Sequence, residues 1–183
     1  MGTSVATELM ARDLANELDM EIVGALLFNG SILLHRAKPT PAQRLLRSRF
    51  GPLFSKLANE RVFRHQLGSV FSSSHPLGAD EAADHWSLIA HNGGHRLGHK
   101  LVHYMNERET FADRWHGAFR DWPKPLFLLW GMQDPVARPA VLDGLLDLRP
   151  HAPVTKLDEV GHYPQLEAPT RVVTAVEQAA SPS

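Results

Sequence analysis

The sequence predicts an α/β protein with a small parallel sheet and a long helical insertion. Three short apolar runs have the pattern of buried strands, namely residues 22–28, 126–130 and 154–157. Continuous apolar runs of this length are typical of parallel strands whose two faces are both covered. Helical patterns lie between the runs, and such alternation along a chain indicates α/β architecture.

The first part of the chain predicts a helix followed by a strand. Val5, Leu9 and Leu14 recur at helical spacing, so we expect a helix over residues 3–17. The apolar run at 22–28 ends at Asn29-Gly30, a sequence that interrupts regular structure.

The last part of the chain continues the alternation. The strand at 126–130 follows Asp-Trp-Pro-Lys-Pro, which ends any preceding helix, and it stops at Gly131. A helix is expected over 138–147, then the strand at 154–157, and finally a helix over 169–180 with apolar residues on one face.

The middle of the chain has a different character. Residues 31–122 contain several short helical patterns that are joined by glycine, serine and proline. We therefore predict that residues 1–30 and 123–183 form an α/β core, and that residues 31–122 form a helical cap.

Composition excludes several classes of function. The formal charge of −1 supplies no basic surface for a phosphate backbone, so nucleic acid is not expected as a partner. The absence of cysteine excludes disulfides, thiolate metal sites and a cysteine nucleophile. The first residues do not form a secretory signal, and no apolar run is long enough for a membrane span, so we expect a cytoplasmic protein without a membrane partner.

Two loops carry residues suited to catalysis. Asp134 follows the strand at 126–130, and His162 follows the strand at 154–157. The carboxyl ends of parallel strands share one edge of the sheet, and an acid followed by a histidine is the chain order of a nucleophile–acid–histidine triad. We expect the carboxylate to orient the imidazole, which would act as the base. Each residue could alternatively be an ordinary loop residue.

These loops resemble those of a known superfamily. The segments WGMQDPV and GHYPQLEAP resemble the acid loop and the histidine loop of the α/β-hydrolases. The segments LFNGS and WSLIAHNGG are most similar to the capped branch that contains epoxide hydrolases, haloalkane dehalogenases and mesoderm-specific-transcript-like proteins. The resemblance implies the C-terminal part of an α/β-hydrolase sheet, with Asp134 as the triad acid, His162 as the base, and Gly30 where the sheet enters the cap.

The front of the chain departs from the family pattern. Met1-Gly2-Thr3-Ser4 resembles the end of the strand-to-helix turn that carries the nucleophile, which would stand immediately before Met1. Met1 and Gly2 would then be remnants of this elbow and of the oxyanion hole. We expect that the chain lacks its nucleophile, either Asp or Ser, and is inactive alone. A start placed inside a longer gene, or a fragment of a larger protein, would explain this.

Other residues could contact a substrate. Trp86, Tyr104 and Trp115 are the candidates for the substrate pocket, although simple packing would explain each of them equally well. Ser4 lies close to the elbow, and we expect it to cap the first helix instead of acting as a nucleophile.

A histidine run invites a metal interpretation, which we do not favour. His95, His99 and His103 recur every fourth residue and would lie on one face of a helix. No carboxylate joins them at a known spacing, and nearby glycines weaken a helix there. No metal or organic cofactor is therefore expected.

The sequence thus predicts a hydrolase-like protein that in complete form acts on a small uncharged ester or epoxide. The alternative is a non-catalytic binding or interaction module derived from the same fold. The strand at 22–28 would normally pair on both edges, so self-association through its open edge is also predicted.

Overall fold

The computed structural model describes residues 1–180 and contains a parallel sheet of three strands in the order β1-β2-β3. The strands are β1 (Ala25–Phe28), β2 (Leu126–Gly131) and β3 (Val154–Leu157). The predicted fold class is confirmed. β1 starts three residues later than the apolar run at 22–28, because its first partner residue follows Pro125, which has no N–H to continue the ladder.

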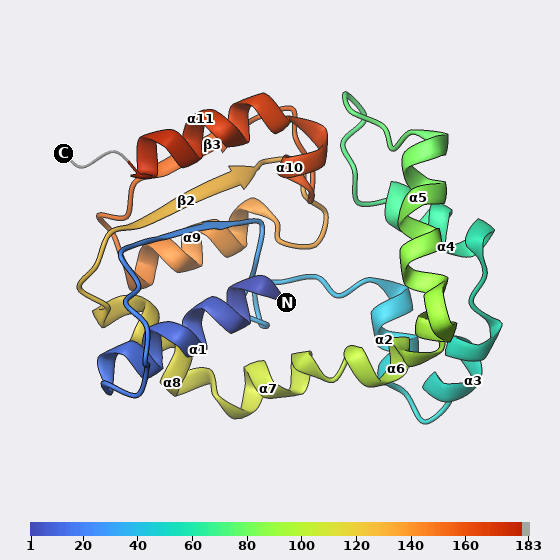
Figure 1. The fold of residues 1–183 in the computed structure, drawn as a ribbon, viewed down its shortest axis with the longest axis horizontal. Coiled ribbons are helices and arrows are strands. Elements are labelled where there is room, and N and C mark those ends of the chain that lie inside the picture. Colours follow the sequence, from blue (N-terminus) through green and yellow to red (C-terminus); the bar gives the residue numbers. More distant parts are fainter. Residues whose placement is uncertain (181–183) are drawn as a thin grey trace.

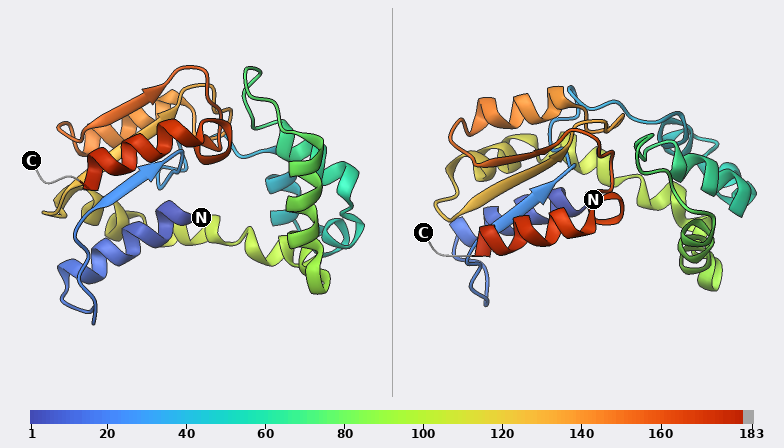
Figure 2. Two further views of the ribbon diagram at one scale, coloured as in Figure 1. Left: turned by 45° about the horizontal axis from the view of Figure 1, so that its top comes forward. Right: turned by 90° about the horizontal axis from the view of Figure 1, so that it is seen from above.

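Helices cover both faces of this sheet, as Figures 1 and 2 show. One face is covered by α1, α8 and α9, and the other by α11. The bounds are α1 Gly2–Leu14, α8 Ala112–Asp121, α9 Pro139–Leu148, α10 Pro164–Glu167 and α11 Pro169–Ala180. Within residues 1–180, no helix has both the length and the apolar character that crossing a bilayer requires.

The two covered faces explain why the strands are apolar throughout. In β2, Leu128 and Trp130 point into the cluster formed with α1, α8 and α9. Leu129, between them, points the other way and packs near Val172 of α11. Since alternate residues of a strand face opposite sides, both sets of positions must be apolar when both sides are buried.

Helix α8 lies in the stretch expected for the cap but packs on the core. Trp115 and Phe119 of α8, and Trp122 directly after it, belong to the same buried cluster as Met10 of α1. Polar contacts join these two helices as well, because Trp115 Nε1 donates to Glu8 Oε2 at 2.9 Å. Helix α8 therefore packs on α1 within the buried core, although it lies within residues 31–122.

The remaining helices form a separate group beyond the carboxyl ends of the strands (Figure 1). They are α2 Pro41–Arg47, α3 Gly51–Leu57, α4 Glu60–Gly68, α5 Ala79–Ala90, the 3₁₀ helix η1 His91–Leu97, and α6 Gly98–Leu101. Helix α7 (Tyr104–Thr110) leads back to the core. Local signals define these short helices: Thr40 and Gln43 form a capping box at α2, and Asn59 caps α4.

The predicted helix with His95, His99 and His103 on one face is wrong. Residues 91–97 form a 3₁₀ segment in which Asn92 and Gly93 have positive φ angles of 50° and 74°, so the helix of α5 does not continue. His99 Nδ1 instead lies 3.2 Å from Ser55 Oγ, and His103 Nδ1 lies 3.0 Å from Asn106 Nδ2. Across the part of the chain that the structure describes, no three His, Asp or Glu side chains are grouped for a metal ion.

Candidate active site

The side chains of Asp134 and His162 meet at the carboxyl end of the sheet. Asp134 lies in the loop after β2 and His162 in the loop after β3, and the distance from Asp134 Oδ2 to His162 Nδ1 is 2.6 Å. The Asp134 side chain is completely buried, whereas 24% of the His162 side chain is exposed. A fully buried acid thus holds a histidine whose side chain is still partly exposed to solvent.

The carboxylate of Asp134 is fixed by further hydrogen bonds. The backbone N–H groups of Val136 and Ala137 donate to its Oδ1 atom at 2.7 and 3.0 Å. Oδ2 accepts from Asn29 Nδ2 at 2.8 Å in addition to its contact with His162. A buried carboxylate needs such donors, and their directions determine which oxygen faces the imidazole.

Asn29 is a site residue that the sequence analysis did not identify. It directly follows β1, has a positive φ of 44°, and joins the ends of two strands. Its Oδ1 accepts from Gly131 N at 2.8 Å, and its Nδ2 donates to Gly131 O at 3.1 Å. The available signal was an asparagine at the end of a buried strand, where it tolerates the left-handed conformation.

A second buried carboxylate, Glu167, holds the histidine loop. Glu167 is 6% exposed and accepts hydrogen bonds from three backbone N–H groups. Gly161 and Ser72 donate to Oε2 at 2.7 and 2.9 Å, and Tyr163 donates to Oε1 at 3.1 Å. The only sequence signal for this role of Glu167 was its position in the segment HYPQLE, within the predicted histidine loop.

The cap also contacts the histidine loop. The backbone N–H of His162 donates to Val70 O at 2.9 Å, and Ser72, two residues further along, is bound by Glu167. The two residues belong to the connection between α4 and α5. The backbone of the cap therefore contributes directly to the position of His162.

The first turn of α1 lies against the end of β1. A Cβ atom on Gly30 would overlap the side chain of Thr3, so only glycine allows this close approach. Gly30 adjoins Asn29, which contacts Asp134. The amino end of α1, with Met1 and Gly2, thus lies at the same end of the sheet as the two loops (Figure 1). The elbow and oxyanion roles of Met1 and Gly2 stay predictions.

Ser4 does not cap α1, contrary to expectation. The cap position is Met1, without a side-chain hydrogen bond, and Ser4 is buried. Its Oγ accepts from Arg108 Nε at 2.9 Å. Arg108 lies over the ring of Tyr104, 4.7 Å from its centre, and burial lowers the pKa of its guanidinium. The hydroxyl thus serves as a partner for a buried cation.

The three candidate pocket residues do not come together. Trp115 and Tyr104 border a groove of about 270 Å³ between α1, α7 and α8. Trp86 instead lines a cavity within the cap. Tyr163 is nearer to the site, because its ring meets the ring of His162 edge-on at 5.0 Å. Burial, assisted by the neighbouring Tyr104 and Asp134, raises the pKa of Tyr163.

A three-stranded parallel sheet with helices on both faces defines the fold class of this protein. The chain is a partial α/β-hydrolase-fold chain, and it resembles hydrolases in sequence. No protein-family profile matches it. The protein named "Putative hydrolase LipZ" of Mycobacterium tuberculosis is 51% identical over 169 residues, covering 92% of this chain and 59% of LipZ. The human mesoderm-specific transcript homolog protein is 32% identical over 179 residues, covering 95% and 53% respectively.

Solved structures agree with this assignment of the fold. An α/β-hydrolase-fold protein from Burkholderia ambifaria superimposes with a TM-score of 0.70 at 14% identity, covering 94% of this chain and 62% of that one. A thermophilic esterase from Thermogutta terrifontis superimposes with a TM-score of 0.69 at 18% identity, covering 97% and 60%. The chain thus spans little more than half the length of the proteins it resembles.

Proposed function

We propose that this chain supplies the acid and the base of a nucleophile–acid–histidine triad in an α/β-hydrolase. The supporting observation is the 2.6 Å contact between fully buried Asp134 and partly exposed His162. The substrate would be a small uncharged ester or epoxide. The nucleophile would be an aspartate or a serine.

In the proposed mechanism, Asp134 holds His162 in the tautomer that carries a proton on Nδ1. Nε2 is then the atom that takes protons. With an ester, the nucleophile attacks the carbonyl carbon, and the alcohol leaves with a proton relayed by His162. His162 next removes a proton from water, whose oxygen attacks the covalent intermediate and releases the acid. With an epoxide, an aspartate attacks a ring carbon, and the released alkoxide takes a proton from solvent water to give a hydroxy ester. The same histidine then activates water for hydrolysis of that ester.

The test requires both the chain alone and a longer polypeptide. Purified 183-residue chain should hydrolyse neither para-nitrophenyl butyrate nor styrene oxide faster than its His162→Ala variant. A chimera in which this chain replaces the matching segment of LipZ should turn over at least one of them. Asp134→Asn in that chimera should lower turnover by roughly 10⁴-fold, the loss known for a triad acid in a serine protease.

Controls make the outcome decisive. Asp158→Asn changes an exposed carboxylate that precedes the same histidine loop, and it should leave turnover unchanged. Turnover by the chain alone that is lost in His162→Ala would contradict the missing nucleophile. A folded chimera that is equally active with and without His162 would contradict the triad.

The alternative is a binding module without catalysis. A specific observation favours it as a second function: the cap contains an apolar cavity whose lining excludes both triad loops. If the chimera folds but neither hydrolyses substrate nor reacts with a covalent hydrolase probe, binding becomes the better account.

A further inference from the structure

Arg108 of α7 is the only buried lysine or arginine within residues 1–180, with 7% of the residue exposed. Its Nε donates to Ser4 Oγ at 2.9 Å, and its guanidinium carbon lies 4.7 Å from the centre of the Tyr104 ring. None of the ion pairs within the described residues includes it. A buried charge is ordinarily paired, because its removal from water is costly. The structure therefore leaves this positive charge without an anionic partner.

The electrostatics around Arg108 agree with an uncompensated charge. Burial is the main cause that lowers the pKa of its guanidinium, and only Tyr104 opposes this effect. Burial and then the charge of Arg108 lower the pKa of the Met1 amino group to about 6. A carboxylate close to either group would raise its pKa, and no carboxylate acts on them. The amino end of α1 is therefore a positively charged environment.

The two terminal nitrogens of Arg108 are available to a ligand. Ser4 occupies Nε, whereas Nη1 and Nη2 form no hydrogen bond within residues 1–180. Both atoms keep contact with solvent, because His95 Nδ1 is the only side-chain nitrogen or oxygen in this range that is closed off from solvent and has no partner. Two parallel N–H groups at the end of a guanidinium match the two oxygens of a carboxylate.

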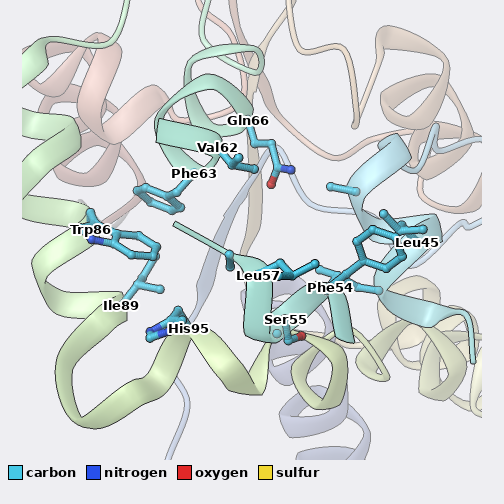
Figure 3. A pocket seen from close by; sticks show the side chains of 14 residues that line it. Leu45, Phe54, Ser55, Leu57, Val62, Phe63, Gln66, Trp86, Ile89 and His95 are labelled. Atoms are coloured by element: carbon cyan, nitrogen blue, oxygen red, sulfur yellow. The ribbon is translucent and has the colours of Figure 1, made fainter. Parts of the chain in front are cut away.

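The position of Arg108 relates it to the proposed triad. Its partner Ser4 belongs to the first turn of α1, whose amino end lies at the same end of the sheet as the loops of Asp134 and His162 (Figure 1). The amino end of a helix also favours a negative charge. The cavity of the cap, in contrast, is lined by no carboxylate, ammonium or guanidinium group (Figure 3). An anion is therefore expected at Arg108 and not in the cap.

We propose that Arg108 binds the carboxylate of a small monocarboxylic acid through Nη1 and Nη2. Tyr104 packs on one face of the guanidinium, and Ser4 fixes its rotation. Hydrolysis of an uncharged ester releases one carboxylic acid, so Arg108 holds the acid product, a role that rests on the proposed function. The binding itself requires no nucleophile and can be measured with the 183-residue chain.

The experiment is an NMR titration of the 183-residue chain with sodium butyrate, the acid that para-nitrophenyl butyrate yields, at neutral pH and constant ionic strength. The Arg108 Nε–H signal, identified from its loss in Arg108→Gln, should shift and saturate. Saturation transfer from protein to butyrate measures the affinity of each variant. Butyramide has nearly the same shape without the charge, and it should bind more than about 10-fold more weakly.

Variants separate the guanidinium from general effects of charge. Arg108→Gln should weaken butyrate binding more than about 10-fold, because the charged donors are lost. Arg120→Gln is the matched control at an exposed arginine that Asp121 already pairs at 2.7 Å, and it should leave binding unchanged. Ser4→Asp supplies a carboxylate to Arg108 from within the chain and should remove butyrate binding. Ser4→Asn, which is similar in size and uncharged, should retain it.

Two results would overturn the carboxylate site. These are an Arg108 signal that butyrate does not shift, and equal butyrate binding by wild type and folded Arg108→Gln. If Arg108→Gln does not fold, the comparison of Ser4→Asp with Ser4→Asn gives the same test, and equal binding by these two variants refutes the site.

The chimera with LipZ tests the product role separately. Butyrate should inhibit its turnover of para-nitrophenyl butyrate competitively, and butyramide should not. An active chimera that is not inhibited at butyrate concentrations that saturate Arg108 would refute this role. An inactive chimera would count against the proposed function alone, because butyrate binding by the 183-residue chain still decides the carboxylate site.

Discussion

Asn29 illustrates how one side chain can join two loops that are far apart in the sequence. It bonds both backbone groups of Gly131 and the carboxylate of Asp134. Asp134 in turn contacts His162. The geometry of the predicted acid and base therefore depends on a residue that has no acid–base chemistry of its own.

We predict that Asn29→Gly destabilises the chain by about 1.5 to 3 kcal/mol, because a buried hydrogen bond to a charged group is lost. Glycine retains the positive φ of 44° without strain, so the change isolates the side chain. Urea unfolding of wild type and Asn29→Gly would measure this loss in the free energy of unfolding.

The control is Asn16→Gly, which changes another asparagine with positive φ at an exposed position. Its effect should stay within about 0.5 kcal/mol. Equal effects of the two substitutions would show that Asn29 acts only through its backbone conformation.

Asp134 and His162 could be predicted from sequence because each belongs to a loop with a recognisable local pattern after a buried strand. Asn29 and Glu167 could not be assigned in the same way. Their roles are to bind backbone groups of Gly131, Ser72 and Gly161, which are ordinary in sequence and become neighbours only in the fold.

Helices α1 and α8 form the most connected pair of elements around the sheet, and Glu8 is the polar centre of their interface. Its carboxylate accepts from Arg12 of α1 and from Arg114 and Trp115 of α8. The hydrogen bond from Arg114 contributes most to lowering the pKa of Glu8 to about 2, and partial burial opposes this shift.

We predict a stability difference between wild type and Glu8→Gln that depends on pH. The folded-state pKa of Glu8 is below its ordinary value of 4.5, so the stabilisation is fully present above that value. It is lost as the pH falls toward 2. Above pH 4.5 the difference should be about 1 kcal/mol, because solvent screens this partly exposed group.

Urea unfolding at several pH values would measure this difference. Glu17→Gln is the matched control, since Glu17 is more exposed and lies 3.9 Å from Arg114. A Glu8→Gln difference that is constant between neutral pH and the acid limit would contradict the assigned cause.

The element boundaries show where local sequence is sufficient. The strand at 154–157 and the helix at 169–180 were predicted with the observed bounds, because their apolar spacing agrees with their tertiary packing. The histidine spacing at 95, 99 and 103 failed, because the left-handed residues Asn92 and Gly93 interrupt the helix. Periodicity cannot detect a break made by backbone conformation.

At the scale of the whole molecule, both outer strands of the sheet, β1 and β3, have one edge without a partner strand within residues 1–180. Strand β1 pairs with β2, and within the described residues its other edge has no partner strand. Such edges present free backbone donors and acceptors that can pair with another strand.

We predict that the 183-residue chain associates with itself through this edge as its concentration rises. Val23→Lys, at a 78% exposed position just before β1, should reduce the associated fraction, because a lysine opposes edge-to-edge pairing. Sedimentation velocity would measure the fraction. Val173→Lys on α11, which is 55% exposed, should leave it unchanged. A chain that stays monomeric over the whole range, or two variants with equal effects, would contradict this prediction.

The sequence by itself determined the α/β class, the three strands, and the two loops that carry Asp134 and His162. These follow from apolar patterns and short motifs, which are local properties of the chain. Tertiary structure alone decided that α8 packs on α1, that Asn29 and Glu167 fix the two loops, and that Trp86 and His95 line a separate cavity in the cap. These facts depend on contacts between residues distant in sequence, and such contacts have no local pattern because either partner alone would be compatible with many neighbours.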